Sequence, residues 1–285
     1  GDVYKRQVYS LFGPNPLLAR LTQALIVGVL HPLLAFLIGR KVFGKLIGLA
    51  AAAITALYVY FIYYAGALMT EPFYITAILA SLYLAMLAVD LPQDGETAGK
   101  YRIALGLGLA LGVTVLLRQL FLLVIPFIFL WILLAGWRQL RILVPAGLVI
   151  LALILPFTVF NYARFERFVL LNTNAGFAFF WGNHPIYGTN FEPILPTAMG
   201  TYQELIPREL LSLDEAALDQ ALLRRGLQFV VDDPGRYLLL SLSRIPAYFM
   251  FWPSPDSSNI SNLSRVASFG ILWPFMLYGL IRCLL

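Results

Sequence analysis

The stretch TEPFYITAILASLYLAMLAVDL, residues 70–91, decides the fold class. No residue between Glu71 and Asp90 carries a charge. A helix that crosses a bilayer needs about 20 mostly apolar residues. The stretch therefore predicts a transmembrane helix with one carboxylate at its beginning. The role of that carboxylate depends on the side of the membrane where it lies and on the groups around it.

The composition extends this reading to the whole chain. The 285 residues are 60% hydrophobic and 12% charged, with a mean hydropathy of +0.79. Soluble domains carry about 45–50% apolar and about 25% charged residues, so we expect an integral membrane protein whose surrounding is the lipid bilayer. The net charge of +5 does not indicate a nucleic-acid partner, because Lys and Arg gather at the cytoplasmic ends of membrane helices. Cys283 is the single cysteine, so an internal disulfide is excluded, and the sequence carries no sign of an oligomer.

The apolar runs predict an all-α fold, a polytopic transmembrane helix bundle with an outer-face loop and helical segment. Residues 1–7 resemble a translated sequencing adapter and are expected to be a non-native artefact. Residues 8–160 hold about six spans, a polar and aromatic segment covers 161–265, and a further transmembrane helix covers 266–285. The expected spans before residue 160 are 17–39, 46–68, 72–91, 103–117, 120–134 and 142–160.

Basic residues predict the orientation. Arg20 and Arg118 lie at one set of helix ends, whereas most other basic residues of the bundle lie at the opposite ends. The positive-inside rule makes the richer set cytoplasmic. Glu71, Arg118 and the 161–265 segment then share the outer face. The residues expected in the cytoplasm are Arg40, Lys41, Lys45, Lys100, Arg102, Arg138 and Arg141.

The outer segment has helix signals of its own. SLDE, residues 212–215, reads as a capping box that begins an amphipathic helix. In DDPG, residues 232–235, Asp233 can cap a second helix and Pro234 can take its first position. Residues 237–252 are apolar enough to span, but Arg244 and Pro246 favour a helix lying on the outer surface.

Two charged residues are the main candidates for chemistry. Thr70 or Glu71 can cap the helix that follows, with Pro72 in its first turn, and a negative charge there interacts favourably with the helix dipole. An ionisable group at membrane depth also marks a functional site. Arg118 can extend its charge towards lipid headgroups or hold a phosphate with two parallel hydrogen bonds. Arg20 has the same two alternatives, with the first favoured.

The remaining polar features have weaker signals. His31, beside Pro32, lies within the first expected span, where a buried neutral histidine satisfied by a neighbouring helix is favoured over a site. The loop NTNAGFAFFWGNHP, residues 172–185, combines amides and aromatic rings, which suit sugar recognition but also suit packing on a membrane surface. Its candidates for substrate binding are Asn174, Trp181 and Asn183. No metal-ligand spacing, phosphate loop or nucleophile motif is present in the sequence.

In order and spacing, four stretches resemble the polytopic GT-C glycosyltransferases, in particular the bacterial branch related to protein mannosyltransferases and the lipid A aminoarabinose transferase. These are VYSLFGPNPLLARLTQAL (8–25), YYAGALMTEPFYITAILASLYL (63–84), GLALGVTVLLRQLFLLVIP (108–126) and NYARFERFVLLNTNAGFAFFWGNHPIYGT (161–189). The resemblance implies inverting transfer of a sugar from a polyprenyl-phosphate donor to a lipid, protein or glycan of the cell envelope. It places the active face on the periplasmic or extracellular side of a bacterial inner membrane.

The resemblance also implies a departure. The principal catalytic Asp of the family lies in an outer loop that would precede residue 8, so we expect an N-terminally truncated chain that is inactive alone. Glu71 matches a second, near-site carboxylate, and Arg118 matches a basic position suited to the lipid phosphate. A divalent metal, used by some members, would have its ligands outside this chain. The alternative function is a transporter or flippase of a lipid-linked or small substrate, which would show paired halves with broken helices.

Overall fold

The computed structural model describes residues 15–91, 97–192, 201–255 and 257–285, and in these ranges it is helical with no strand. The expected all-α polytopic helix fold is confirmed: five helices are long and apolar enough to cross a membrane, or up to six if one bent pair is counted as a span. The chain divides into two compact units, residues 1–156 with 253–285, and residues 157–252. We describe each unit by itself.

Unit 1 begins with α2 (Pro16–Phe43), whose first turn is set by local chemistry. The side chain of Asn15 accepts hydrogen bonds from the backbone N–H groups of Leu17 and Leu18, at 3.0 and 3.3 Å, and Pro16 follows in the first turn. An amide cap followed by proline is a common helix beginning, since it satisfies N–H groups that have no partner in the helix. Gly44, with φ of +90°, then turns the chain into α3 (Lys45–Leu57).

The second expected span, 46–68, is a bent pair instead of one straight helix. α3 and α4 (Val59–Ala65) meet at Tyr58, whose backbone is extended, and the two axes differ by 54°. Neighbouring Ile54, Thr55 and Val59 are β-branched, and such residues hold a helix less well. This bend was not expected from the apolar pattern, which gives no sign of where a long run is interrupted.

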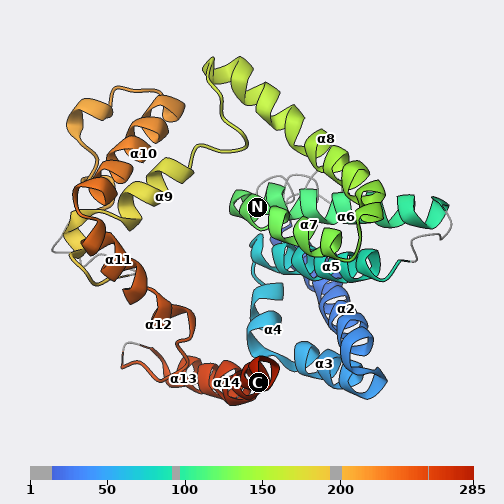
Figure 1. Ribbon diagram of the computed structural model, residues 1–285. Coiled ribbons are helices and arrows are strands. Elements are labelled where there is room, and N and C mark those ends of the chain that lie inside the picture. Colours follow the sequence, from blue (N-terminus) through green and yellow to red (C-terminus); the bar gives the residue numbers. More distant parts are fainter. Residues whose placement is uncertain (1–14, 92–96, 193–200, 256) are drawn as a thin grey trace. The chain divides into compact units, whose positions relative to one another are not determined.

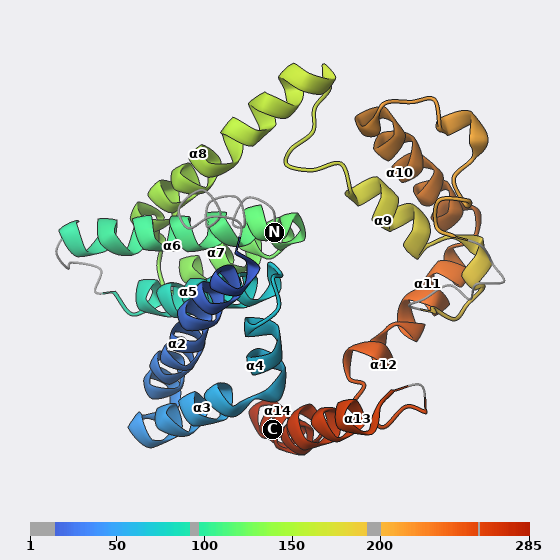
Figure 2. The ribbon, with the colours of Figure 1, turned by 180° about the vertical axis from the view of Figure 1, so that it is seen from behind.

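Three further long helices of the bundle are α5 (Glu71–Val89), α6 (Thr97–Leu117) and α8 (Leu140–Phe165), and the last two extend beyond the expected spans 103–117 and 142–160. α5 and α6 lie side by side, as both ribbon views show (Figures 1 and 2). Arg118 then interrupts the helix, and a 3-10 turn (Gln119–Leu123) leads into α7 (Ile125–Leu134), which is shorter than the expected span 120–134 and too short to cross a bilayer alone. A second 3-10 turn (Trp137–Gln139) precedes α8.

Close helix packing in unit 1 depends on small residues. A Cβ atom on Gly48 of α3 would come within 2.8 Å of backbone atoms of α2, and one on Gly108 of α6 within 2.7 Å of the Ala146 carbonyl oxygen of α8. Glycine lets the backbones approach, as is usual between membrane helices. Outward-facing residues such as Leu25, Phe127 and Leu134 are exposed and suit contact with lipid. The last helices of this unit, α13 (Asn259–Arg265) and α14 (Ile271–Leu284), are joined by a π-helical turn, Val266–Gly270, and together form a candidate span that begins before residue 266.

Unit 2 is a small helical unit built on α9 (Ala175–Gly182) and α10 (Glu215–Asp232), which lie side by side in both views (Figures 1 and 2). Its core contains Phe180, Ile206 and Leu222. α11 (Pro234–Ser243) and α12 (Ile245–Tyr248) follow, and both are too short to span, so residues 237–252 are not a candidate membrane span. Two 3-10 turns, Pro185–Tyr187 and Arg208–Leu210, lie in the connections.

One helix beginning in unit 2 was predicted correctly and one was not. Asp233 accepts a hydrogen bond from the backbone N–H of Arg236 and Pro234 begins α11, as expected. The capping box on Ser212 is wrong, because Asp214 caps α10 by accepting from the N–H of Ala217 at 2.8 Å. Glu215, the expected acidic partner in that box, accepts instead from the hydroxyl of Thr173.

Candidate functional site

The two main candidates of the sequence, Glu71 and Arg118, form an ion pair in unit 1. The Arg118 Nη2 group donates to Glu71 Oε1, and the side chains are 50% and 37% exposed respectively. These residues are 47 positions apart in the chain. The folding of α5 against α6 brings them together, since Glu71 begins α5 and Arg118 follows the end of α6.

Glu71 lies in the first turn of α5, but its carboxylate does not cap the helix. The preceding residue, Thr70, has helical backbone angles and makes no side-chain cap, while Pro72 follows in the first turn. The negative charge still lies at the positive end of the helix dipole. The carboxylate is bound to a guanidinium. The capping role expected for Thr70 or Glu71 is therefore wrong, and the role of Glu71 in a functional site stays a prediction.

Arg118 lies at the break between α6 and the 3-10 turn that follows it. Its backbone is extended (φ −147°, ψ 101°), and its N–H still bonds to the Thr114 carbonyl at 2.9 Å. This extended backbone ends α6 at the residue before Arg118. Within the described ranges, Glu71 is the partner recorded for the Arg118 guanidinium, which has five N–H donors and so retains capacity for a further acceptor.

A second ion pair lies at the other end of α5. Lys41, in the last turn of α2, donates to Asp90, which ends α5. Gln139 Nε2 also donates to the Leu91 carbonyl at 3.4 Å, so the connection between α7 and α8 lies at this end as well. The two pairs therefore mark opposite ends of α5. Lys41 belongs to the set of basic residues that the sequence assigns to the cytoplasm.

Arg20 makes no recorded contact with the Glu71–Arg118 pair. It is exposed near the beginning of α2, and no hydrogen bond or ion pair of its side chain is recorded among the described residues. Its assignment to substrate binding stays a prediction.

The three candidates of the aromatic loop belong to unit 2, and two of them take part in packing. Trp181 Nε1 donates to the Tyr202 carbonyl at 2.8 Å. Buried Asn183 ends α9, donates to the Phe179 carbonyl at 2.9 Å and accepts from Arg244 at 3.4 Å. Asn174 precedes α9 and is exposed, without a side-chain cap. Of the three, Asn174 has its amide most open to a ligand, and all three roles stay predictions.

Two arginines that the sequence reading did not select bind the end of α9. Arg236 donates to the carbonyl oxygens of Asn183 and Phe229, at 3.0 and 3.4 Å. Arg244 donates to the Gly182 carbonyl and lies over the ring of Phe191, 4.9 Å from its centroid. Positive side chains at a helix C-terminus satisfy carbonyls that have no partner in the helix. Through these contacts the two arginines stabilise residues 181–183, which we call the Trp-Gly-Asn turn.

The polar and aromatic groups beside this turn have shifted pKa values. Burial lowers the pKa of His184 below its usual value, and the charge of Arg236 lowers it further. His184 Nδ1 accepts from the N–H of Ile186 at 3.2 Å, which requires an unprotonated nitrogen and agrees with this direction. Burial, with a contribution from Tyr202, raises the pKa of Tyr187 to about 12, so its phenol stays protonated at neutral pH.

Metal binding has no candidate among the described residues. Those ranges contain no group of three or more His, Cys, Asp or Glu side chains that could hold an ion. The divalent metal of the sequence analysis therefore stays a prediction with no ligand assigned here.

Gln23 is a contact residue that sequence reasoning missed. It is fully buried in α2, and its amide N–H groups point to the carbonyl oxygens of Tyr64, Ala65 and Ala67. The signal available in the sequence was a polar residue in an otherwise apolar run, eight positions before His31, which places both on one helix face.

Comparison with known proteins gives a family match over the first part of the chain. A family model described as dolichyl-phosphate-mannose-protein mannosyltransferase matches residues 5–160. The match therefore includes α2 to α7 and most of α8, with both members of the Glu71–Arg118 pair. No curated protein and no solved structure matches the chain.

Proposed function

Because the chain belongs to the dolichyl-phosphate-mannose-protein mannosyltransferase family, we propose that it moves a sugar from a polyprenyl-phosphate-linked donor to an acceptor at the outer face of a bacterial inner membrane. Family membership makes it a membrane glycosyltransferase of the mannosyltransferase type. The donor, the inversion at the sugar carbon and the acceptor side are parts of our proposal. The acceptor class is a lipid, protein or glycan of the cell envelope.

The observation that carries the proposal is the half-exposed ion pair of Arg118 and Glu71. In sugar transfer from a lipid phosphate, the bond between the sugar carbon and the phosphate oxygen breaks, and negative charge develops on the phosphate. A guanidinium offers a planar fork of N–H donors that fits two phosphate oxygens. A fixed positive charge beside the leaving group stabilises the transition state more than it would in water. We assign this role to Arg118.

Glu71 is assigned a positioning role and not that of the base. Its carboxylate already accepts from Arg118, so it orients the guanidinium and limits the rotamers that the long side chain can adopt. In an inverting reaction the acceptor hydroxyl attacks the sugar carbon from the face opposite the phosphate and gives its proton to a base. We assign no described residue as that base.

The distribution of charge supports the proposed side of the membrane. The Lys41–Asp90 pair lies at the end of α5 opposite to Glu71, and Lys41 is one of several basic residues expected in the cytoplasm. The Glu71–Arg118 pair is then assigned to the outer face. Asn174 and the Trp-Gly-Asn turn of unit 2 are assigned to recognition of the sugar or the acceptor, where the exposed amide of Asn174 is the first candidate.

A transfer assay tests the proposal directly. Membranes from cells that express the protein are incubated with radiolabelled polyprenyl-phosphate mannose, and label in the acceptor fraction is counted. We expect transfer with inverted anomeric configuration, and Arg118→Ala should lower kcat/KM by about 10²-fold or more, as is usual when a donor to transition-state charge is removed. Transfer by the variant at the parent rate would remove Arg118 from the site.

The alternative, a transporter or flippase, is favoured by one observation. The bent pair α3–α4 and the interruption at Arg118 are broken helices of the kind that line transport sites. The same donor lipid, incorporated in proteoliposomes that contain the protein, distinguishes sugar transfer from lipid transport. A flippase would expose the lipid at the outer leaflet without any transfer of sugar, and that result would replace our proposal.

A further inference from the structure

Two buried polar residues of α2 contact the segment that carries Glu71. Gln23 and His31 lie on one face of the helix with Val27 between them, and all three are nearly or fully buried. Both polar side chains bond to backbone carbonyls of residues 64–72, at least 41 positions away in the chain. Side chains of this kind join membrane helices by hydrogen bonds across their interfaces, because a polar group left unpaired in an apolar environment is costly.

Gln23 holds the beginning of this segment. Its Nε2 group lies 3.2 Å from the Tyr64 carbonyl oxygen and 3.0 Å from that of Ala65, and it also donates to the Ala67 carbonyl. These carbonyls lie at the C-terminal end of α4 and just after it, where the regular helical bonding pattern ends. Those of Tyr64 and Ala67 also accept backbone N–H groups, from Ala67 at 3.1 Å and from Met69 at 2.8 Å. Gln23 Oε1 is buried without a partner among the described residues. The three carbonyls therefore fix the amide orientation, since a flipped amide would place oxygen against oxygen.

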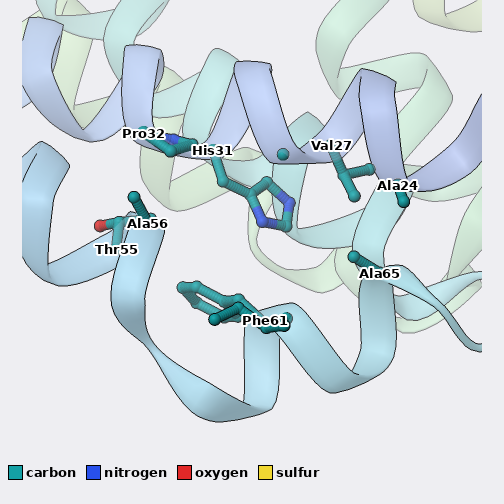
Figure 3. A pocket seen from close by; sticks show the side chains of 10 residues that line it. Ala24, Val27, His31, Pro32, Thr55, Ala56, Phe61 and Ala65 are labelled. Atoms are coloured by element: carbon teal, nitrogen blue, oxygen red, sulfur yellow. The ribbon is translucent and has the colours of Figure 1, made fainter.

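His31 holds the end of the segment. Its Nε2 atom lies 2.9 Å from the carbonyl oxygen of Pro72, the residue next to Glu71. A carbonyl oxygen can only accept, so Nε2 carries the proton and donates. The ring also meets Phe61 of α4 edge-on, with centroids 5.1 Å apart. Figure 3 shows the imidazole between α2 and α4, at a cavity of about 220 Å³ lined by small residues such as Ala24, Gly28 and Ala56.

We infer that Gln23 and His31 are positioning residues that hold the 64–72 segment against α2 and so place Glu71 opposite Arg118. The segment is fixed at both ends: at Tyr64–Ala67 by the glutamine and at Pro72 by the histidine. Glu71, whose neighbour is bound, can then reach the Arg118 guanidinium from the first turn of α5. The functional meaning of this placement rests on the proposed donor site, but the placement itself can be measured without activity.

The test measures proximity of positions 71 and 118 by cross-linking. Glu71→Cys and Arg118→Cys are combined in a Cys283→Ser background, which removes the exposed free thiol. The protein is then placed in lipid nanodiscs and treated with a bis-maleimide that has a two-carbon linker. Gln23→Leu and His31→Leu should each slow cross-linking by about tenfold, because each removes the side-chain hydrogen bonds that join α2 to the 64–72 segment. His31→Gln should restore the rate, since its amide nitrogen can donate where Nε2 does.

The matched control is Thr22→Val. The Thr22 hydroxyl donates to Leu18 of its own helix at 2.8 Å and does not hold the segment. This control should cross-link at the parent rate. Parent rates in Gln23→Leu and His31→Leu would overturn the inference. Equal slowing in Thr22→Val, or failure of His31→Gln to restore the rate, would reduce these contacts to general packing and would overturn it too.

A second readout separates this inference from the proposed function. Binding of polyprenyl phosphate is measured in the same variants with Glu71 and Arg118 restored. If the parent chain binds no polyprenyl phosphate, the proposed donor site fails while cross-linking still decides the positioning role. If the parent binds, Gln23→Leu and His31→Leu should raise Kd, and His31→Gln and Thr22→Val should not. A parent-like Kd in both leucine variants would contradict positioning of the donor site.

Discussion

Arg118 and Glu71 show how a charge can be kept in a largely apolar chain. Each side chain is between one third and one half exposed, so their contact contributes about 0–1 kcal/mol to stability, as exposed ion pairs do. A small energy cannot explain an arginine whose extended backbone interrupts a membrane helix. We propose that the pair is a preorganised site, in which the carboxylate orients the guanidinium for an anionic ligand.

His184 gives a residue-scale prediction about pH. Its pKa is lowered in the folded protein by burial and by Arg236, while the unfolded chain has the ordinary value of about 6.5. As pH falls below about 6.5, the unfolded state binds a proton that the folded state resists, so stability falls. Protonation also removes the acceptor for the N–H of Ile186.

The measurement is the midpoint temperature of thermal unfolding of the detergent-solubilised chain between pH 8 and pH 5.5. Unfolding is monitored by the proteolysis of unit 2. We expect the midpoint to fall with pH. His184→Asn should flatten this slope, because its side-chain oxygen can still accept from Ile186 and does not titrate. A slope as steep in the variant as in the parent would show that other groups cause the pH dependence.

At the scale of elements, the local signals predicted helix beginnings and endings better than long-range contacts. Asp233-Pro234 and Glu71-Pro72 act within one helical turn, so a short window contains their physics. The choice of Asp214 over Ser212 as the cap depended on the N–H that each could reach. The pairing of Glu71 with Arg118 depends on how α5 packs against α6, which no short window contains.

The same limit explains Gln23 and the bend at Tyr58. A glutamine in an apolar run indicates a polar contact but does not name its partner, and here the partners are carbonyls more than 40 residues away. His31 was expected to be satisfied by a neighbouring helix, and the bond to the Pro72 carbonyl confirms that expectation. The 54° bend between α3 and α4 lies within one long apolar run, and the apolar pattern alone does not mark where that run is interrupted.

Packing of α9 on α10 gives an element-scale prediction. A Cβ atom on Gly176 would lie 1.8 Å from the Asp219 carbonyl oxygen, so Gly176→Ala must separate the two helices. Overpacking of this kind costs about 1–3 kcal/mol. The expected result is a lower midpoint temperature of unit 2, measured by heating in detergent and counting the protein that remains monodisperse.

Gly235→Ala is the matched control in α11. Its added Cβ would meet only the Asp233 side chain, at 3.6 Å, an ordinary contact. Alanine is also the better helix former, so the control should keep the midpoint or raise it. Equal midpoints for Gly176→Ala and the parent would contradict the close crossing of α9 and α10.

For the whole molecule, charge predicts orientation. The basic ends of the bundle hold Lys41, paired with Asp90, and Lys45 at the turn between α2 and α3. The positive-inside rule places these residues in the cytoplasm. Unit 2, which carries the Trp-Gly-Asn turn, is then predicted outside.

Cysteine labelling of intact cells checks this orientation. In a Cys283→Ser background, exposed Thr189→Cys should react with a membrane-impermeant maleimide, and exposed Lys45→Cys should react only after permeabilisation. The reverse pattern would invert the topology and place the Glu71–Arg118 pair on the cytoplasmic side.

The central claim is that Arg118, oriented by Glu71, holds the phosphate of a polyprenyl donor. The most direct measurement is the Kd of polyprenyl phosphate for the chain in nanodiscs, in the parent, Arg118→Ala, Glu71→Gln and the double variant, with polyprenol as the uncharged control. We predict that Arg118→Ala raises Kd by about tenfold or more, because hydrogen bonds to a charged group contribute about 1.5–3 kcal/mol. As a single substitution, Glu71→Gln should also raise Kd. The double variant should have the same Kd as Arg118→Ala, because Glu71 acts through Arg118. Parent-like affinity in Arg118→Ala, or equal binding of polyprenol, would contradict the claim.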